Sequence, residues 1–173
     1  MEKIYISIRA ITLPYNKLPL DLRLEWIEIS SVINSNAEPE ALYKQLAHES
    51  VLYAEIIEIA IKTERRETKI IGTEEEIIQK FLNNLQKYVD KDVEFQLVGF
   101  RLKQMMSLIY QKTLLYGINN YWLESKIDCK PWELNIISVE ERFAWLTKNY
   151  ISENYLKLFF KENDFFKILQ KIY

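Results

Sequence analysis

The chain contains very few of the residues on which several classes of protein depend. Its 173 residues include one cysteine, one histidine, three glycines and four prolines. A single cysteine excludes a disulfide within the chain, which is typical of a reducing compartment. One cysteine and one histidine are too few ligands for a structural zinc site. The scarcity of glycine and proline predicts long helices and strands joined by short connections.

Basic charge and long apolar runs are also missing. The net charge is −2 at pH 7, so overall charge does not indicate nucleic acid or an anionic membrane, although it is compatible with a local basic patch. No apolar run approaches the length of a membrane span. The first residues, MEKIYISIRA, lack a cationic stretch followed by an apolar one. We therefore expect no signal peptide, a cytoplasmic location and no membrane partner.

Apolar residues, in contrast, are plentiful. Hydrophobic residues make up 49% of the chain and aromatic residues 13%, whereas a disordered chain would be poorer in both. The length suits a single domain over residues 1–173. Cys129 is interpreted as a half-buried structural thiol and His48 as a surface or helix-end residue. The tryptophans are interpreted as packing residues: Trp26, Trp122, Trp132 and Trp145.

The periodicity of apolar residues predicts five strands among helices. Strands are expected at residues 3–9, 54–62, 66–72, 93–98 and 133–137. The first three should be antiparallel neighbours with 3–9 near the centre of the sheet, and the last two should run parallel to the first. Helices are expected at residues 20–33, 38–49, 73–89 and 102–117. This order predicts an α/β fold of three layers, because helices with one apolar face must cover the sheet.

Polar residues mark where several helices should begin. Thr73 is followed by Glu76 and Ser138 by Glu141, and both pairs have the spacing of a capping box. Further helix starts are expected at Ser152 and at Asn163 or Asp164. The polar run ERRETK, residues 64–69, is interpreted as the solvated tip of a hairpin.

Three segments together resemble one known family of nucleases. The phrases LYAEIIEIAI (52–61), FQLVGFRLKQMMSLIYQKTLLYGI (95–118) and CKPWELNIISVEERFAWL (129–146) are similar to segments of the predicted 3′–5′ exonucleases of the DNA polymerase B type. These belong to the DEDD nucleases. The resemblance covers residues 43–150 well and 1–14 loosely. It implies a ribonuclease H-like three-layer fold with a mixed, roughly five-stranded sheet flanked by helices.

The resemblance also implies a catalytic site from which this chain departs. Family members hold two divalent metal ions between an Asp and a Glu on the first strand and one Asp on each of two helices. Ser7 and Arg9 stand at the two strand positions, and Met106 stands at the Asp of the first helix. In the last motif, Phe160 and Asp164 stand at a Tyr and an Asp, so one acid remains.

Two of these replacements disfavour a metal ion. A guanidinium at Arg9, about 5 Å from a divalent ion, would repel it by roughly 7 kcal/mol at an effective dielectric constant near 20. Met106 replaces a hard oxygen ligand and belongs to an apolar helix stripe, so Met105 and Met106 are interpreted as core residues. We therefore predict no intact catalytic site, no metal or other cofactor, and no nuclease activity.

The expected function is that of a catalytically inactive exonuclease-like domain that binds DNA or RNA, or a protein partner. Arg9 and Arg101 are the candidate nucleic-acid-binding residues; Phe100 and Arg101 replace a His and an Asn of the family motif. Arg9 has a second interpretation, as the ion-pair partner of Asp164 or Glu55, and a third, as a surface position without a specific contact.

Two other functions stay open. One is a residual 3′–5′ exonuclease that uses magnesium or manganese with acids such as Glu55, Glu58 or Asp164. The other is a scaffold that binds protein and makes no contact with nucleic acid. Nucleic-acid binding that weakens with salt would distinguish the first function from the scaffold.

Overall fold

The computed structural model describes residues 1–47, 50–120, 135–141 and 153–172. Its strands are β1 (Glu2–Thr12), β2 (Ala54–Lys62), β3 (Glu67–Ile70), β4 (Phe95–Gly99) and β5 (Ile136–Ser138). A 3-10 turn, η1, covers Tyr15–Lys17. The helices are α1 (Leu20–Ile33), α2 (Pro39–Leu46), α3 (Glu74–Val89), α4 (Leu102–Tyr116), α7 (Glu153–Phe160) and α8 (Phe165–Ile172). The predictions for His48, Cys129, Ser152, Trp122, Trp132 and Trp145 lie outside the described residues.

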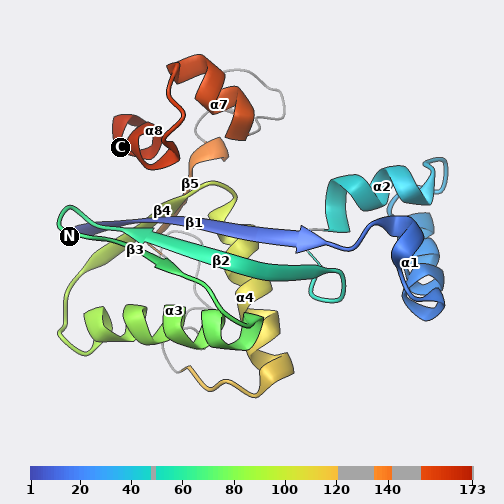
Figure 1. Cartoon of the computed structure of the whole chain (residues 1–173), viewed down its shortest axis with the longest axis horizontal. Helices are drawn as coiled ribbons and strands as arrows, with labels where there is room; N and C mark the ends of the chain where they lie inside the picture. Colours follow the sequence, from blue (N-terminus) through green and yellow to red (C-terminus); the bar gives the residue numbers. More distant parts are fainter. Residues whose placement is uncertain (48–49, 121–134, 142–152, 173) are drawn as a thin grey trace.

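The strands form one mixed sheet in the order β3-β2-β1-β4-β5. β2 is antiparallel to both β1 and β3, whereas β4 is parallel to both β1 and β5. Helices α3 and α4 cover one face and α7 and α8 the other, while α1 and α2 stand beyond one end of β1 (Figure 1). The predicted α/β fold and sheet are confirmed, and the architecture is consistent with a ribonuclease H-like three-layer fold.

The limits of some elements differ from those expected. β3 ends at Ile70 rather than at residue 72, because Gly72 adopts a φ of 154° and Thr73 is already the N-cap of α3. The capping box of Thr73 and Glu76 is confirmed. β4 starts at Phe95 rather than at residue 93, after Asp92 turns the chain with a φ of 52°. Within the described ranges, no helix is long and apolar enough to cross a membrane.

Side chains of β1 alternate between two cores, as the period of a strand requires. Ile4 and Ile6 are fully buried in the larger core, which α3 and α4 complete. Tyr5 points to the other face and belongs to the smaller core, together with Leu169 of α8. β1 is therefore covered by helices on both faces, but only part of its length is covered on the α7–α8 face.

A third apolar cluster holds α1 and α2 together away from the sheet. Trp26 is 2% exposed and makes edge-to-face contacts with Tyr43 and Tyr53, at ring-centroid distances of 5.2 and 5.1 Å. Its indole Nε1 donates to the carbonyl of Pro39 at 2.8 Å. The prediction that Trp26 is a packing residue is confirmed.

A buried ion pair closes the part of the β2 edge that β3 does not reach. Glu74, the first residue of α3, accepts hydrogen bonds from the backbone N–H of Ile56 at 2.7 Å and from Lys112 Nζ at 3.0 Å. Lys112 Nζ also donates to the carbonyl of Ala54 at 2.7 Å, and the hydroxyl of Tyr116 donates to Glu74. The two charged side chains thus take the place of a paired strand, because an unpaired sheet edge must be satisfied or covered.

Candidate functional site

The predicted site positions on β1 lie on the α7–α8 face of the sheet. Ser7 and Arg9 follow Tyr5 at alternate residues, so they share its face. Ser7 is half-buried and Arg9 is exposed. Across the strand pair Arg9 faces Glu58, whose carboxylate lies 3.9 Å from Lys69 Nζ on β3. The open part of this face therefore carries charges of both signs.

The second interpretation of Arg9, as an ion-pair partner, is not supported by the structure. In the described part of the chain neither Asp164 nor Glu55 forms an ion pair with Arg9. Asp164 has a different role, because its Oδ1 accepts hydrogen bonds from the backbone N–H groups of Phe166 at 3.0 Å and Lys167 at 3.3 Å. It is the N-cap of α8, and the helix start predicted there is confirmed.

Met106 lies in the larger core. It is 4% exposed and belongs to the same cluster as Ile4 and Ile6, so the prediction that Met105 and Met106 are core residues is confirmed. Ser7 and Arg9 point to the opposite face. The structure thus brings Ser7 and Arg9 together, whereas Met106 packs on the other side of β1 and Asp164 caps a helix.

The turn between β4 and α4 contains Gly99 and Phe100, and Phe100 stands at the His of the family motif. A Cβ atom on Gly99 would lie 2.6 Å from the carbonyl oxygen of Ile6, so only glycine lets β4 approach β1 this closely. Phe100 then packs in the smaller core, with its ring 6.3 Å from that of Phe165 in an edge-to-face contact. The position of the family's His is therefore filled by a ring that contacts the residue next to Asp164.

Arg101 occupies a constrained position at the start of α4. The residue is half-buried, and its backbone is in the left-handed conformation with a φ of 50°. Its backbone N–H donates to Glu140 Oε2 at 2.7 Å. Ser138 accepts from the N–H of Lys103 at 3.0 Å, so side chains of another segment cap this helix. Burial raises the pKa of Glu140, and the N–H of Arg101 partly opposes that increase.

Arg9 and Arg101 both lie beyond the last residue pair of the parallel strands β1 and β4. That pair is Ile6 and Gly99, so Arg9 follows it by three residues and Arg101 by two. Among the described residues no three His, Cys, Asp or Glu side chains are grouped so that they could hold a metal ion.

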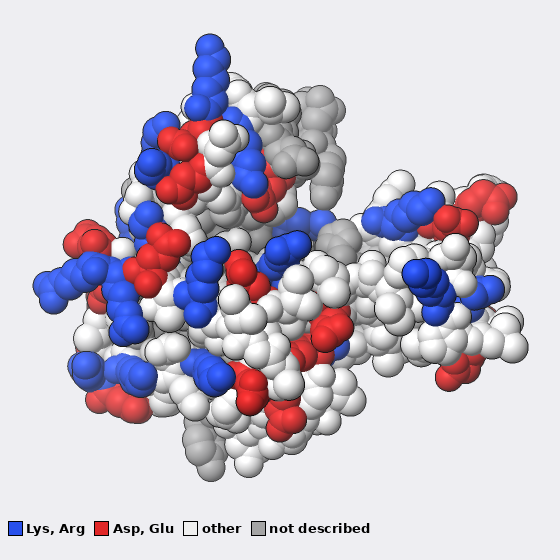
Figure 2. All heavy atoms as spheres, viewed as in Figure 1, with Lys and Arg blue, Asp and Glu red and all other residues white. Residues whose placement is uncertain are grey.

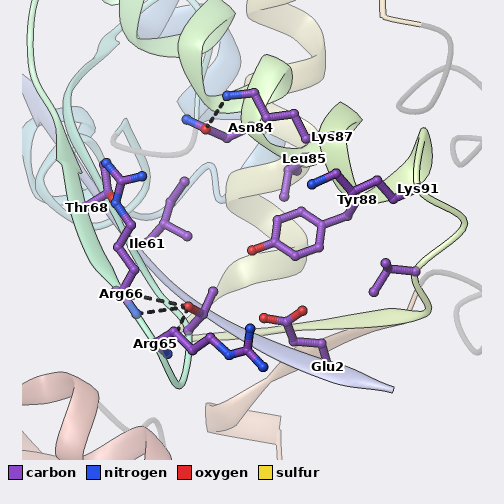
Figure 3. Close-up of a pocket in the computed structure, with 12 residues that line it drawn as sticks. Glu2, Ile61, Arg65, Arg66, Thr68, Asn84, Leu85, Lys87, Tyr88 and Lys91 are labelled. Carbon is purple, nitrogen blue, oxygen red and sulfur yellow. Dashed lines mark hydrogen bonds between the residues drawn. The ribbon is translucent and has the colours of Figure 1, made fainter.

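A second candidate site, which the sequence did not predict, lies at the opposite end of β1. A pocket of about 420 Å³ is bounded by the β2–β3 hairpin, the carboxyl end of α3 and the start of β1 (Figure 3). Its lining is Glu2, Ile61, Thr63, Arg65, Arg66, Thr68, Asn84, Leu85, Lys87, Tyr88, Lys91 and Val93. The run 64–69 was interpreted only as a solvated tip, and Lys87 and Lys91 are too distant in sequence to be associated with it.

Comparison with known proteins leaves this chain without an established family. No family model, curated protein or solved structure matches it. The nuclease resemblance therefore depends on the local segments alone.

Proposed function

We propose that this chain is a degenerate relative of the DNA polymerase B type 3′–5′ exonucleases that binds nucleic acid without cleaving it. One observation carries the proposal. The strand position that holds a catalytic Glu in the family holds Arg9, which is exposed on the open face of β1.

The charge of Arg9 supports binding of a phosphate rather than a metal ion. A guanidinium presents a planar fork of donors that suits phosphate oxygens, and it repels divalent cations. Arg101, two residues beyond the Ile6–Gly99 pair and beside Glu140, is the second residue that we propose to contact phosphate. Because acidic side chains share this face, we expect weak binding without sequence preference, with Kd values of about 10⁻⁴ to 10⁻⁶ M at physiological salt.

The packing around Phe100 supports the loss of cleavage. In the family motif a polar side chain precedes the helix, whereas here Phe100 and Phe165 form an apolar contact between the β4–α4 turn and α8. Magnesium and manganese ions prefer oxygen ligands, and magnesium usually keeps several bound waters; an aromatic contact provides neither.

The proposal is tested with the full chain and labelled single-stranded DNA and RNA. Fluorescence anisotropy should show binding that weakens as salt is raised, and Arg9→Ala should reduce both the affinity and the salt dependence. With magnesium or manganese, the oligonucleotides should stay intact above a buffer control. No binding at low salt would disprove the proposal and favour the protein scaffold.

The residual exonuclease is the second candidate, because Glu55 and Glu58 lie on the same face as Arg9. The two cations Arg9 and Lys69 oppose them, so the local charge is near zero rather than strongly negative. Processive 3′ digestion that Glu58→Gln abolishes would establish this candidate in place of the first.

A further inference from the structure

The pocket beside the β2–β3 hairpin carries an excess of positive charge. Four of its lining residues are cationic, namely Arg65, Arg66, Lys87 and Lys91, and one, Glu2, is acidic. Figure 2 shows Lys and Arg side chains, with some acidic ones among them, over the end of the molecule where the hairpin turns and α3 ends. The pocket therefore differs from the face around Arg9, where cations and acids balance.

None of the four cations is neutralised by an ion pair within the described part of the chain. The acids adjacent in sequence do not line the pocket: Glu64, Glu67, Asp90 and Asp92. Glu67 forms an ion pair with Lys62 at 3.6 Å, and Asp90 Oδ1 accepts a hydrogen bond from Gln86 at 2.8 Å. The carboxyl end of α3 contributes only about half a negative charge. Four like charges around one cavity repel one another, and an anion inside it would remove that repulsion.

The cavity combines these cations with an apolar floor and an aromatic ring. Ile61, Leu85 and Val93 supply the apolar surface. Figure 3 shows the ring of Tyr88 turned into the pocket, with Arg66 on the hairpin side and Lys91 on the side of Tyr88. Burial, and then the charge of Glu2, raises the pKa of Tyr88, so its hydroxyl is a neutral donor at physiological pH.

The backbone of the hairpin tip is held by its own hydrogen bonds. Thr63 Oγ1 accepts from the N–H groups of Arg65 at 3.4 Å and Arg66 at 3.2 Å, and the N–H of Thr63 donates to the carbonyl of Arg66 at 2.8 Å. The side chains of both arginines are exposed and take no part in that turn. They are available to a ligand, and replacing them leaves the tip's backbone bonds intact.

We propose that this pocket binds a nucleotide phosphate, with Arg65, Arg66 and Lys91 around the phosphate groups and the ring of Tyr88 against the base. Its volume of about 420 Å³ falls within the range of small-molecule sites. The guanidinium group of arginine can donate two parallel hydrogen bonds to phosphate oxygens, and an aromatic ring can stack on any base.

The pocket is separate from the site of the proposed function. Glu2 and Arg9 are seven residues apart on one strand, roughly 23 Å at the rise of a β-strand, and the pocket opens on the α3 side of the sheet. The nucleotide is either free or the phosphorylated end of a strand; both sources share the same chemistry. Arg9→Ala should leave nucleotide affinity unchanged, so the two proposals fail independently.

The test is calorimetric titration of the full chain with ADP, tripolyphosphate and a 5′-phosphorylated oligonucleotide at low salt. The double variant Arg65→Ala and Arg66→Ala should weaken ADP binding at least about tenfold, since hydrogen bonds between charged groups are the strong ones. The control variant Lys17→Ala and Lys167→Ala loses the same charge at exposed positions away from the pocket, and it should bind like the parent.

The variant Tyr88→Leu distinguishes the contribution of the base to binding from that of the phosphate groups. It should weaken ADP binding about fivefold or more and leave tripolyphosphate binding unchanged, because only the nucleotide has a base to stack. Tighter binding of the oligonucleotide than of ADP would assign the site to strand ends, and the reverse would assign it to free nucleotides. The proposal is overturned if the parent does not bind ADP, or if the arginine variant and the lysine control bind it equally.

Discussion

The two faces of the sheet differ in how completely they are closed. On the α3–α4 face, β1 contributes fully buried isoleucines to the larger core, and even the charged pair Glu74 and Lys112 is buried and hydrogen-bonded. On the α7–α8 face, coverage reaches Tyr5 but leaves Arg9 exposed. The α3–α4 face holds the larger core beside β1, whereas the α7–α8 face leaves the part of β1 around Arg9 free to carry binding groups.

The largest expected effect is a difference in stability between two variants that each place a new carboxylate on one face. Met106→Asp should lower the free energy of unfolding by about 5 kcal/mol, because it removes buried packing and places an unpaired charge in the core. Ser7→Asp, on the open face, should cost less than about 1 kcal/mol. Urea denaturation measures both. If the two variants are equally stable, Met106 and Ser7 do not lie on different faces.

The next effect separates a buried ion pair from an exposed one. Lys112→Met should cost about 3 to 5 kcal/mol, since Glu74 is left charged and buried with no cation. The control is Lys80→Met at the exposed pair of Lys80 and Glu76, 4.0 Å apart, and it should cost less than about 1 kcal/mol. Similar midpoints in urea for the two variants would show that the buried pair is not needed to close the β2 edge.

A smaller effect concerns the cap on the open face. Asp164→Ala should cost about 1 kcal/mol, because the first N–H groups of α8 lose their acceptor, whereas Asp164→Asn should cost almost nothing. The same two variants sharpen the nuclease question. A metal-dependent activity that Asp164→Asn abolishes at unchanged thermal stability would assign the acid to catalysis rather than to capping.

The last effect is a pH dependence of the closed face. Burial, together with the hydrogen bond to Glu74 and its charge, raises the pKa of Tyr116 to about 12 from its ordinary 10.0. The folded state therefore holds this proton more tightly than the unfolded state. The resulting stability is fully present below pH 10 and is lost as pH rises towards 12. In the variant Tyr116→Phe, Tm should therefore fall less between pH 10 and pH 12 than in the parent. An equal fall in Tm in the two proteins would contradict this prediction.

Much of the fold followed from local pattern. Apolar spacing predicted the five strands and the helices α3 and α4, because the period of apolar residues differs between a strand and a helix. The capping box at Thr73 and the core position of Met106 were likewise visible in the sequence, since each depends on residues within one helix.

The sites were less predictable, because they join residues that are distant in the chain. Arg65, Lys87 and Glu2 meet only when a hairpin, a helix end and the first strand are packed together. Glu74 and Lys112 are 38 residues apart, and the need for them arises where β3 ends short of the β2 edge.

The sequence by itself determined the secondary structure, the α/β class and the absence of acids at Ser7, Arg9 and Met106, because these depend on residue type and spacing. Tertiary structure alone decided that Arg9 stays exposed and that Met106 of α4 packs on the opposite side of β1 from it. It also decided that the cations of a hairpin tip and a helix end surround one cavity. The physical reason is that the exposure of a side chain and the local charge around a cavity depend on which segments pack together. The periodicity of one segment does not specify those contacts.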